Sequence, residues 1–271
     1  PEAEAHAPDR AALNEFIETE KSYVKRLMTA YKIYWLGSQA LLSEPEHTKI
    51  FSNLDEIVLA NDNFLQDLVD WENCKYAGKS IADIFLNHIS KFSVYSLYCR
   101  GQQAAVQFLQ EKLQEPAFAA FLRECTGLPE CNGLDLGSFL LEPVQRIARY
   151  PLLLRHIQKF TQPDSEENSV LALAIAESQD LLNRLNAAMA EAENEVKVLS
   201  IQRRLSQARP LSHSRAALSF DAMDLLPSGW KHKLDPALLP ADFSGLTRAL
   251  GARQLLKSGL WVKLKSRRKF L

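Results

Sequence analysis

One stretch of this chain carries more structural information than any other: residues 141–154 read LEPVQRIARYPLLL. Apolar residues recur through it and at its two ends with the spacing of a helix that buries one side, namely Leu140, Val144, Ile147, Tyr150, Leu154 and Ile157. Gln145 and Arg149 are four residues apart and therefore share a side of that helix. Because this side lies roughly 200° from Ile147 at about 100° per residue, we expect both residues to point away from the core.

Outward from this stretch, most of the chain shows the same helical periodicity. The expected helices lie approximately at 9–37, 45–78, 80–99, 101–126, 135–160 and 166–207. Asp9 can cap the first helix, and Ser80 with Asp83 resembles a capping box at the start of the third. Gly101 divides the third helix from the fourth, which is interrupted near Pro116. Since each helix buries only one stripe, the sequence predicts an all-α protein folded as an elongated six-helix bundle.

The sequence changes character near its C-terminal end. Residues 209–250 contain four prolines and weak periodicity, which is typical of a linker or an extended arm. Residues 251–271 alternate apolar and polar side chains around a Lys-Ser-Gly turn, as a β-hairpin does. They also carry seven lysines or arginines and no acidic residue. We therefore expect three parts: a helical domain at 9–208, a linker at 209–250 and a short hairpin at 251–271.

Composition excludes several classes of protein. The chain has 271 residues with a formal net charge of −1, which argues against nucleic-acid binding. No apolar run approaches the roughly 18 residues of a membrane span, and no signal peptide is visible. The four cysteines form no C-x-x-C pair, so we expect reduced thiols in a cytoplasmic protein.

Motifs for covalent chemistry and for metal binding do not occur in the sequence. The six histidines show no zinc-binding spacing, so we expect no metal and no cofactor. Gly78-Lys79-Ser80 is only a fragment of a phosphate-binding loop, and we interpret it as a helix break followed by a cap. We therefore do not expect an enzyme that makes or breaks covalent bonds.

Three segments resemble a known family. Residues 141–154 are similar to the most characteristic motif of the Dbl homology domain, the RhoGEF domain of guanine nucleotide exchange factors. Residues 14–27, NEFIETEKSYVKRL, resemble the opening motif of that domain, and residues 181–187, LLNRLNA, resemble its closing segment. Residues 253–270 resemble the first hairpin of a pleckstrin homology domain, and residues 246–253 resemble the intersectin-like branch.

The resemblance implies a function without covalent chemistry. Proteins of this family accelerate nucleotide release from Rho-family small GTPases by stabilising the nucleotide-free state. By position in the motifs, Glu15 would contact the first switch of the GTPase, Gln145 and Arg149 the second switch, and Asn186 would add a hydrogen bond. The remaining residues expected to contact the GTPase are Glu18, Ser22 and Leu152. The intersectin-like ending favours the cell-division-control branch of GTPases and leaves the Rho and Rac branches open.

The C-terminal basic residues suggest a second partner. In a complete pleckstrin homology domain, Lys263, Lys265, Arg267 and Arg268 would face a phosphoinositide membrane and recruit the cytoplasmic protein to the plasma membrane; a solvated hairpin explains them equally well. Two other interpretations of the chain stay open. One is a helical scaffold that binds a GTPase or another partner without exchanging its nucleotide. The other is a membrane-surface helical protein, although strong positive charge without acid is confined to the last 21 residues.

Overall fold

The computed structural model describes residues 10–76 and 78–207, with side chains through residue 200. The chain divides into two compact units, 1–190 and 191–271, and of the second unit only the helical residues 191–207 are described. Within the described residues every regular element is a helix, so the all-α prediction is confirmed there. The expected cap at Asp9, the linker at 209–250 and the hairpin at 251–271, with its four basic residues, lie outside the described residues.

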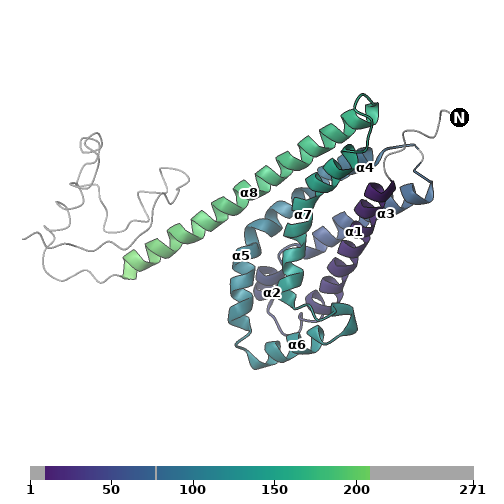
Figure 1. Ribbon diagram of the computed structural model, residues 1–271. Helices are drawn as coiled ribbons and strands as arrows, with labels where there is room; N and C mark the ends of the chain where they lie inside the picture. Colours follow the sequence, from purple (N-terminus) through teal and green to yellow (C-terminus); the bar gives the residue numbers. More distant parts are fainter. Residues whose placement is uncertain (1–9, 77, 208–271) are drawn as a thin grey trace, which may run out of the picture. The chain divides into compact units, whose positions relative to one another are not determined.

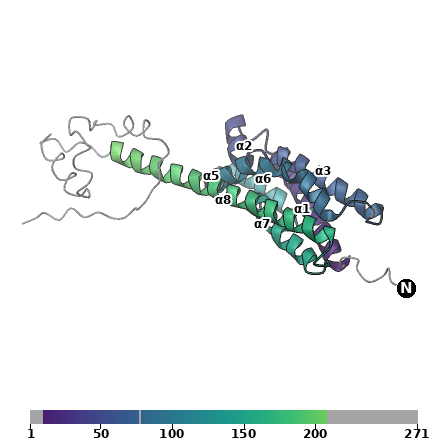
Figure 2. The same ribbon diagram turned by 90° about the horizontal axis from the view of Figure 1, so that it is seen from above.

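The described part contains eight α-helices and three shorter helical segments. The α-helices are α1 (Arg10–Thr29), α2 (Glu44–Phe51), α3 (Leu54–Asn73), α4 (Ile81–Ile89), α5 (Tyr95–Lys112), α6 (Pro116–Thr126), α7 (Leu136–Gln158) and α8 (Glu166–Gln207). The shorter segments are the π-helix η1 (Ala30–Trp35) and the 3-10 helices η2 (Lys91–Val94) and η3 (Pro129–Cys131). In the unit 1–190, α1 lies between α3 and α7 in both views (Figure 1; Figure 2).

Side-chain caps fix where α4 and α7 begin. At the start of α4, the Ser80 hydroxyl accepts from the backbone N–H of Asp83, and the Asp83 carboxylate accepts from the Ser80 backbone N–H at 2.8 Å. At the start of α7, the Asp135 carboxylate accepts from the Ser138 backbone N–H at 2.8 Å. Each side chain satisfies a backbone donor that the first turn leaves free. The predicted capping box and the predicted start near residue 135 are therefore confirmed.

The core of the unit 1–190 gathers around Phe64 of α3, which is fully buried. The rings around it are Phe16, Phe85, Phe92 and Tyr150, with centroids 5.5 to 6.2 Å away and edge-on orientations. Edge-to-face contacts of this kind contribute about 0.5–1.5 kcal/mol each beyond the burial of apolar area. Because these rings come from α1, α3, α4, η2 and α7, the cluster fixes α1 and α7 relative to each other.

Two predicted helix boundaries are wrong. The helix expected at 45–78 is two helices, because the backbone of Ser52 at the end of α2 has a positive φ of 51°, which no helix continues. The break expected at Gly101 is absent, since α5 runs through that residue from Tyr95 to Lys112. A glycine inside a helix costs about 1 kcal/mol, and packing of α5 outweighs that cost. The chain instead breaks ten residues earlier, at η2. The interruption near Pro116 is confirmed, because α6 begins there.

Candidate partner-binding face

Two helices that are distant in the sequence form one exposed face. The Phe16 ring of α1 stacks on the Tyr150 ring of α7, with 6.0 Å between centroids and 28° between planes. Each helix leaves three of the predicted site residues exposed on its outer side, at intervals of three and four residues. They are Glu15, Glu18 and Ser22 on α1 and Gln145, Arg149 and Leu152 on α7. These six residues define the α1–α7 face, and their exposure agrees with the outward orientation inferred for Glu15, Gln145 and Arg149.

A shallow depression of about 190 Å³ lies between the two helices on this face. It is lined by Thr19, Ser22, Tyr23, Arg26, Glu142, Gln145, Arg146 and Arg149. Three of the predicted residues, Ser22, Gln145 and Arg149, therefore meet around one hollow. The Arg26 guanidinium donates to both carboxylate oxygens of Glu142, from Nε at 2.9 Å and from Nη2 at 3.1 Å. This bidentate pair joins α1 to α7 at the side of the depression.

Both predicted acidic residues of α1 have partners. The Glu15 carboxylate lies 3.0 Å from Nδ1 of His156 on α7, and both side chains are about half exposed. The Glu18 carboxylate accepts from Nζ of Lys21 at 2.9 Å, and the same ammonium donates to Glu72 of α3 at 2.8 Å. The Glu72 carboxylate, with Glu18 second, raises the pKa of Lys21. Exposed pairs of this kind contribute about 0–1 kcal/mol, so a partner protein can replace them at little cost.

The remaining predicted residue, Asn186, lies on α8 rather than on the α1–α7 face. It is exposed, whereas Leu181 and Leu185 on the same helix are buried. It does not line the depression between α1 and α7. In the structure Asn186 is exposed on α8 and lies outside the lining of the α1–α7 depression, so its predicted role stays a prediction.

A buried polar network supports the α1–α7 face from below. The Arg146 guanidinium donates to Glu20 Oε2 from Nε at 2.8 Å and from Nη2 at 2.5 Å, and from Nη1 to the Thr19 hydroxyl at 3.1 Å. The Tyr150 hydroxyl donates to Glu20 Oε2 at 3.0 Å. Glu20 is fully buried and Arg146 is 3% exposed. The network continues to Asn61, whose Oδ1 lies 3.2 Å from the Tyr150 hydroxyl and whose Nδ2 donates to the Tyr95 hydroxyl at 2.8 Å.

Charge and burial oppose each other in this network. Burial raises the pKa of the Glu20 carboxyl, and the Arg146 guanidinium beside it counters that rise. A buried charge is tolerated only when it is paired and hydrogen-bonded. Arg146 directly follows the exposed Gln145 in α7 and precedes the buried Ile147. Its ion pair with Glu20 therefore holds this part of α7, which carries the α1–α7 face, against the core.

Sequence reasoning missed Glu20, Arg26, Glu142 and Arg146. A signal for Glu20 was present, because it follows Phe16 by four residues and Ile17 by three and so belongs to the buried stripe of its helix. An acidic residue on such a stripe indicates a buried partner. No local pattern identifies that partner as Arg146, which is 126 residues away.

The described residues contain neither a metal-binding cluster nor a membrane-spanning helix. Among residues 10–76 and 78–207, no group of histidine, cysteine and acidic side chains could hold a metal ion. In the same part of the chain, no helix combines the length and apolar character needed to cross a bilayer. All four cysteines are unpaired, and burial raises the pKa of the Cys99 thiol to about 11. Gly78-Lys79-Ser80 forms the turn and cap before α4, as expected.

Comparison with known proteins identifies the family. Residues 12–186 match the RhoGEF domain. The chain is 33% identical over 195 residues to guanine exchange factor for Rac 30 of Dictyostelium discoideum, covering 72% of this chain and 12% of that protein. It is 29% identical over 261 residues to mouse intersectin-2, covering 94% of this chain and 14% of that protein. The chain therefore belongs to the RhoGEF (Dbl homology) family.

Solved structures agree with this assignment. The linker and DH/PH domains of p115-RhoGEF superpose with a TM-score of 0.69 at 26% identity, covering 83% of this chain and 66% of that one. The DH/PH domains of PDZ-RhoGEF, solved in complex with activated RhoA, share the fold with a TM-score of 0.70 at 23% identity, covering 82% of this chain and 66% of that one. The chain spans only 12% to 14% of the length of the two curated relatives named above.

Proposed function

We propose that this chain is a guanine nucleotide exchange factor for a Rho-family small GTPase, which it engages through the α1–α7 face. The observation that carries the proposal is the meeting of Ser22, Gln145 and Arg149 around one depression, in a chain of the RhoGEF family. The similar proteins support the proposal, since they include a guanine exchange factor for Rac and the DH/PH domains of PDZ-RhoGEF in complex with RhoA.

The chemistry of the face suits a partner that presents both charges and apolar surface. Glu15 and Glu18 bring negative charge from α1, and Arg149 brings positive charge from α7. Leu152 is 61% exposed and offers an apolar contact on the same side of α7 as Gln145 and Arg149. Interfaces of this kind combine a few apolar anchors with charged residues that set orientation.

The proposed mechanism is differential binding. A protein that binds the nucleotide-free GTPase more tightly than the loaded form must weaken nucleotide binding by the same factor. In this account Glu15 holds the first switch away from the metal and nucleotide, and Gln145 with Arg149 holds the second switch. Asn186 contributes a hydrogen bond from α8. The chain supplies no covalent step, and the reacting partner is the GTPase with its own nucleotide and metal.

The finer assignments are also proposals. The exchange domain occupies 9–208, followed by a linker at 209–250 and the start of a pleckstrin homology domain at 251–271. In the complete domain, Lys263, Lys265, Arg267 and Arg268 would bind anionic phosphoinositide headgroups and recruit a cytoplasmic protein to the plasma membrane. The resemblance of residues 246–253 to the intersectin-like branch favours the cell-division-control branch of GTPases and leaves the Rho and Rac branches open.

The direct test measures release of a fluorescent nucleotide from a panel of Rho-family GTPases, with and without this chain. We expect acceleration on at least one GTPase and a large loss with Glu15→Ala, because truncating a central interface residue costs about 2 kcal/mol or more. The matched control is Glu124→Ala, an exposed glutamate on α6. Both variants should keep the wild-type melting temperature, since exposed substitutions change stability by less than about 0.5 kcal/mol. Full activity of Glu15→Ala would reject its assigned role.

A double variant tests the α7 half of the face. Gln145→Ala with Arg149→Ala should abolish capture of the nucleotide-free GTPase and leave helicity unchanged, because both side chains are exposed. A large loss of helicity would instead show that they are structural. Absence of exchange by the wild-type chain, repeated after deletion of 209–271, would favour a scaffold that binds without exchanging nucleotide.

A further inference from the structure

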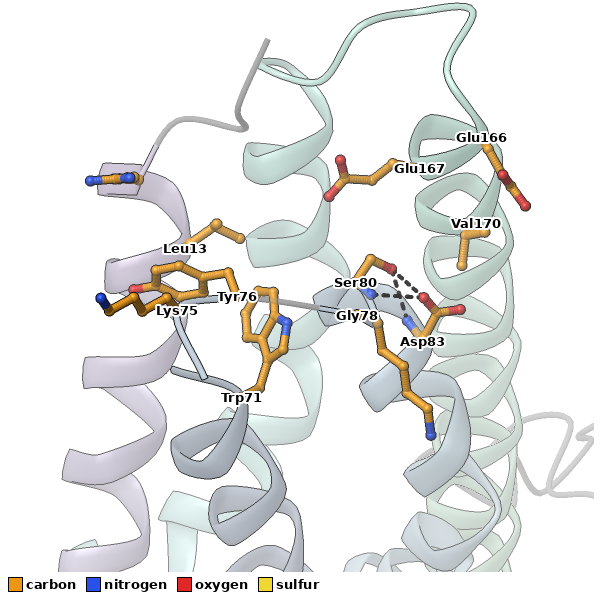
Figure 3. Close-up of a pocket in the computed structure, with 12 residues that line it drawn as sticks. Leu13, Trp71, Lys75, Tyr76, Gly78, Ser80, Asp83, Glu166, Glu167 and Val170 are labelled. Atoms are coloured by element: carbon orange, nitrogen blue, oxygen red, sulfur yellow. Dashed lines mark hydrogen bonds between the residues drawn. The ribbon is translucent and has the colours of Figure 1, made fainter. Parts of the chain in front are cut away.

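A second hollow lies at the other end of α1, away from the α1–α7 depression. Its volume is about 550 Å³, within the usual size of small-ligand pockets. It is lined by Arg10, Leu13, Trp71, Lys75, Tyr76, Gly78, Lys79, Ser80, Asp83, Glu166, Glu167 and Val170. These residues come from the starts of α1, α4 and α8 and from the end of α3 with the turn after it (Figure 3). No residue of the α1–α7 face lines it.

Trp71 gives this pocket an unsatisfied donor. The side chain is 8% exposed, and its indole N–H has no hydrogen-bond partner. In Figure 3 the indole nitrogen lies on the side of the ring that faces Gly78, Ser80 and Asp83. The Ser80 hydroxyl is already bonded to Asp83, so the capping box occupies the nearest hydroxyl. A buried donor without an acceptor is costly, and a ligand acceptor would remove that cost.

Two aromatic rings, Trp71 and Tyr76, line one side of the pocket. Trp71 and Tyr76 meet with centroids 4.8 Å apart and planes at 77°, so they present differently oriented surfaces to the hollow. Leu13 and Val170 line the pocket as well and extend its apolar lining. Aromatic surfaces of this kind attract cations on apolar stems as well as apolar groups.

The charge inside the pocket is negative. Glu167 and Asp83 are both partly buried, and within the described residues neither is paired with a cation. Burial, and then the Asp83 carboxylate, raise the pKa of Glu167. In Figure 3 Glu167 reaches over the pocket, whereas Glu166 points away from it.

Basic residues at the rim do not neutralise these two acids. Arg10, Lys75 and Lys79 are all exposed, so solvent and salt screen their charges. The ammonium of Lys75 points away from Trp71 in Figure 3. Solvent screens the positive charges at the rim more strongly than the negative charges of Asp83 and Glu167. A ligand inside the pocket therefore experiences mainly the two acids.

From these features we propose that the pocket binds a basic side chain of a peptide, arginine or lysine, whose backbone carbonyl accepts from the Trp71 indole N–H. The cation lies against the Trp71 and Tyr76 rings and beside Glu167, and the apolar stem contacts Leu13 and Val170. The site is separate from the proposed exchange activity and needs no GTPase.

The test uses NMR of the indole N–H signals of the ¹⁵N-labelled 271-residue chain. The chain has four tryptophans, and Trp71→Phe assigns the Trp71 signal by its disappearance. The probe is N-acetyl-arginine methylamide, and N-acetyl-citrulline methylamide is the neutral probe of the same shape. A ligand this small should saturate the Trp71 shift in the millimolar range.

The variants separate binding in the pocket from surface attraction. Glu167→Gln should weaken the arginine probe about tenfold, as should replacing arginine by citrulline, since each removes a cation–carboxylate contact. Glu177→Gln, at an exposed glutamate of α8 that does not line the pocket, is the matched control and should change affinity less than about twofold, because exposed charges act weakly. Trp35→Phe assigns the Trp35 signal in the same way, and that signal should stay in place throughout, which reports an intact fold. A Trp71 signal that does not saturate, equal binding of both probes, or equal effects of the two glutamate variants would overturn the proposal.

Discussion

Replacing Arg146 by methionine should unfold the domain more readily than any exposed substitution on the same helix. The change keeps a long apolar stem and removes three hydrogen-bond donors, two to Glu20 and one to Thr19. Glu20 then stays fully buried with only the Tyr150 hydroxyl as a donor. Breaking one side of a buried ion pair costs about 3–5 kcal/mol, which lowers the melting temperature of a domain of this size by roughly 10 °C.

The same variant should show a characteristic pH dependence. Burial already raises the pKa of Glu20 above its ordinary value of 4.5, and loss of Arg146 raises it further. For an acid with a raised folded-state pKa, stability is fully present below the unfolded value and is lost as the pH rises through the folded value. The melting temperatures of wild type and Arg146→Met should therefore differ most at neutral pH and converge as the pH falls toward 4.5.

Thermal unfolding followed by circular dichroism measures both effects. Arg149→Met is the matched control, because Arg149 is an exposed arginine one turn further along α7, and it should change stability by less than about 0.5 kcal/mol. Adding Glu20→Gln to Arg146→Met removes the unpaired charge and should restore part of the lost stability. The reasoning fails if the two methionine variants melt alike, if the loss is independent of pH, or if Glu20→Gln restores nothing.

Three further predictions concern folding of the same unit and are checked by urea denaturation. Ser80→Ala removes the cap of α4 and should lower the free energy of unfolding by about 1 kcal/mol; an unchanged midpoint would contradict the capping role. Phe64→Ala opens a cavity among the core rings and should cost about 3–5 kcal/mol, and a loss below that of Ser80→Ala would argue against its central place. The Ser43 hydroxyl, and then Lys112, lower the pKa of Glu46 to about 2, so its contribution to stability is present above 4.5 and lost as the pH falls toward 2. Glu46→Gln should flatten acid destabilisation in that range, and an unchanged acid profile would exclude the contribution.

The sequence predicted those features of the fold that depend on near neighbours. The outward side of α7, with Gln145 and Arg149, follows from helical periodicity, and the starts of α4 and α7 follow from Ser80 and Asp135. The break predicted at Gly101 was wrong because the free energy that a glycine costs within a helix is smaller than the free energy that α5 gains by packing. The break at Ser52 was missed because serine, unlike glycine, carries no strong preference for a positive φ.

From the sequence, the candidate site was predictable only as exposed residues on separate helices. Periodicity placed Glu15 on one helix and Gln145 on another, and it could not show that Ser22, Gln145 and Arg149 line one depression. The buried pair of Glu20 and Arg146 was out of reach because its members are 126 residues apart. The Trp71 pocket was missed for the same reason, since parts of α1, α3, α4 and α8 combine to form it.

The most direct test of the account compares the affinity of this chain for the nucleotide-free and GDP-loaded forms of each Rho-family GTPase. The account predicts that for at least one GTPase the nucleotide-free form binds much more tightly, and that the double variant Gln145→Ala/Arg149→Ala abolishes its capture. Equal affinity for both forms, or binding to neither form of any Rho-family GTPase, would contradict the claim that this chain exchanges nucleotide.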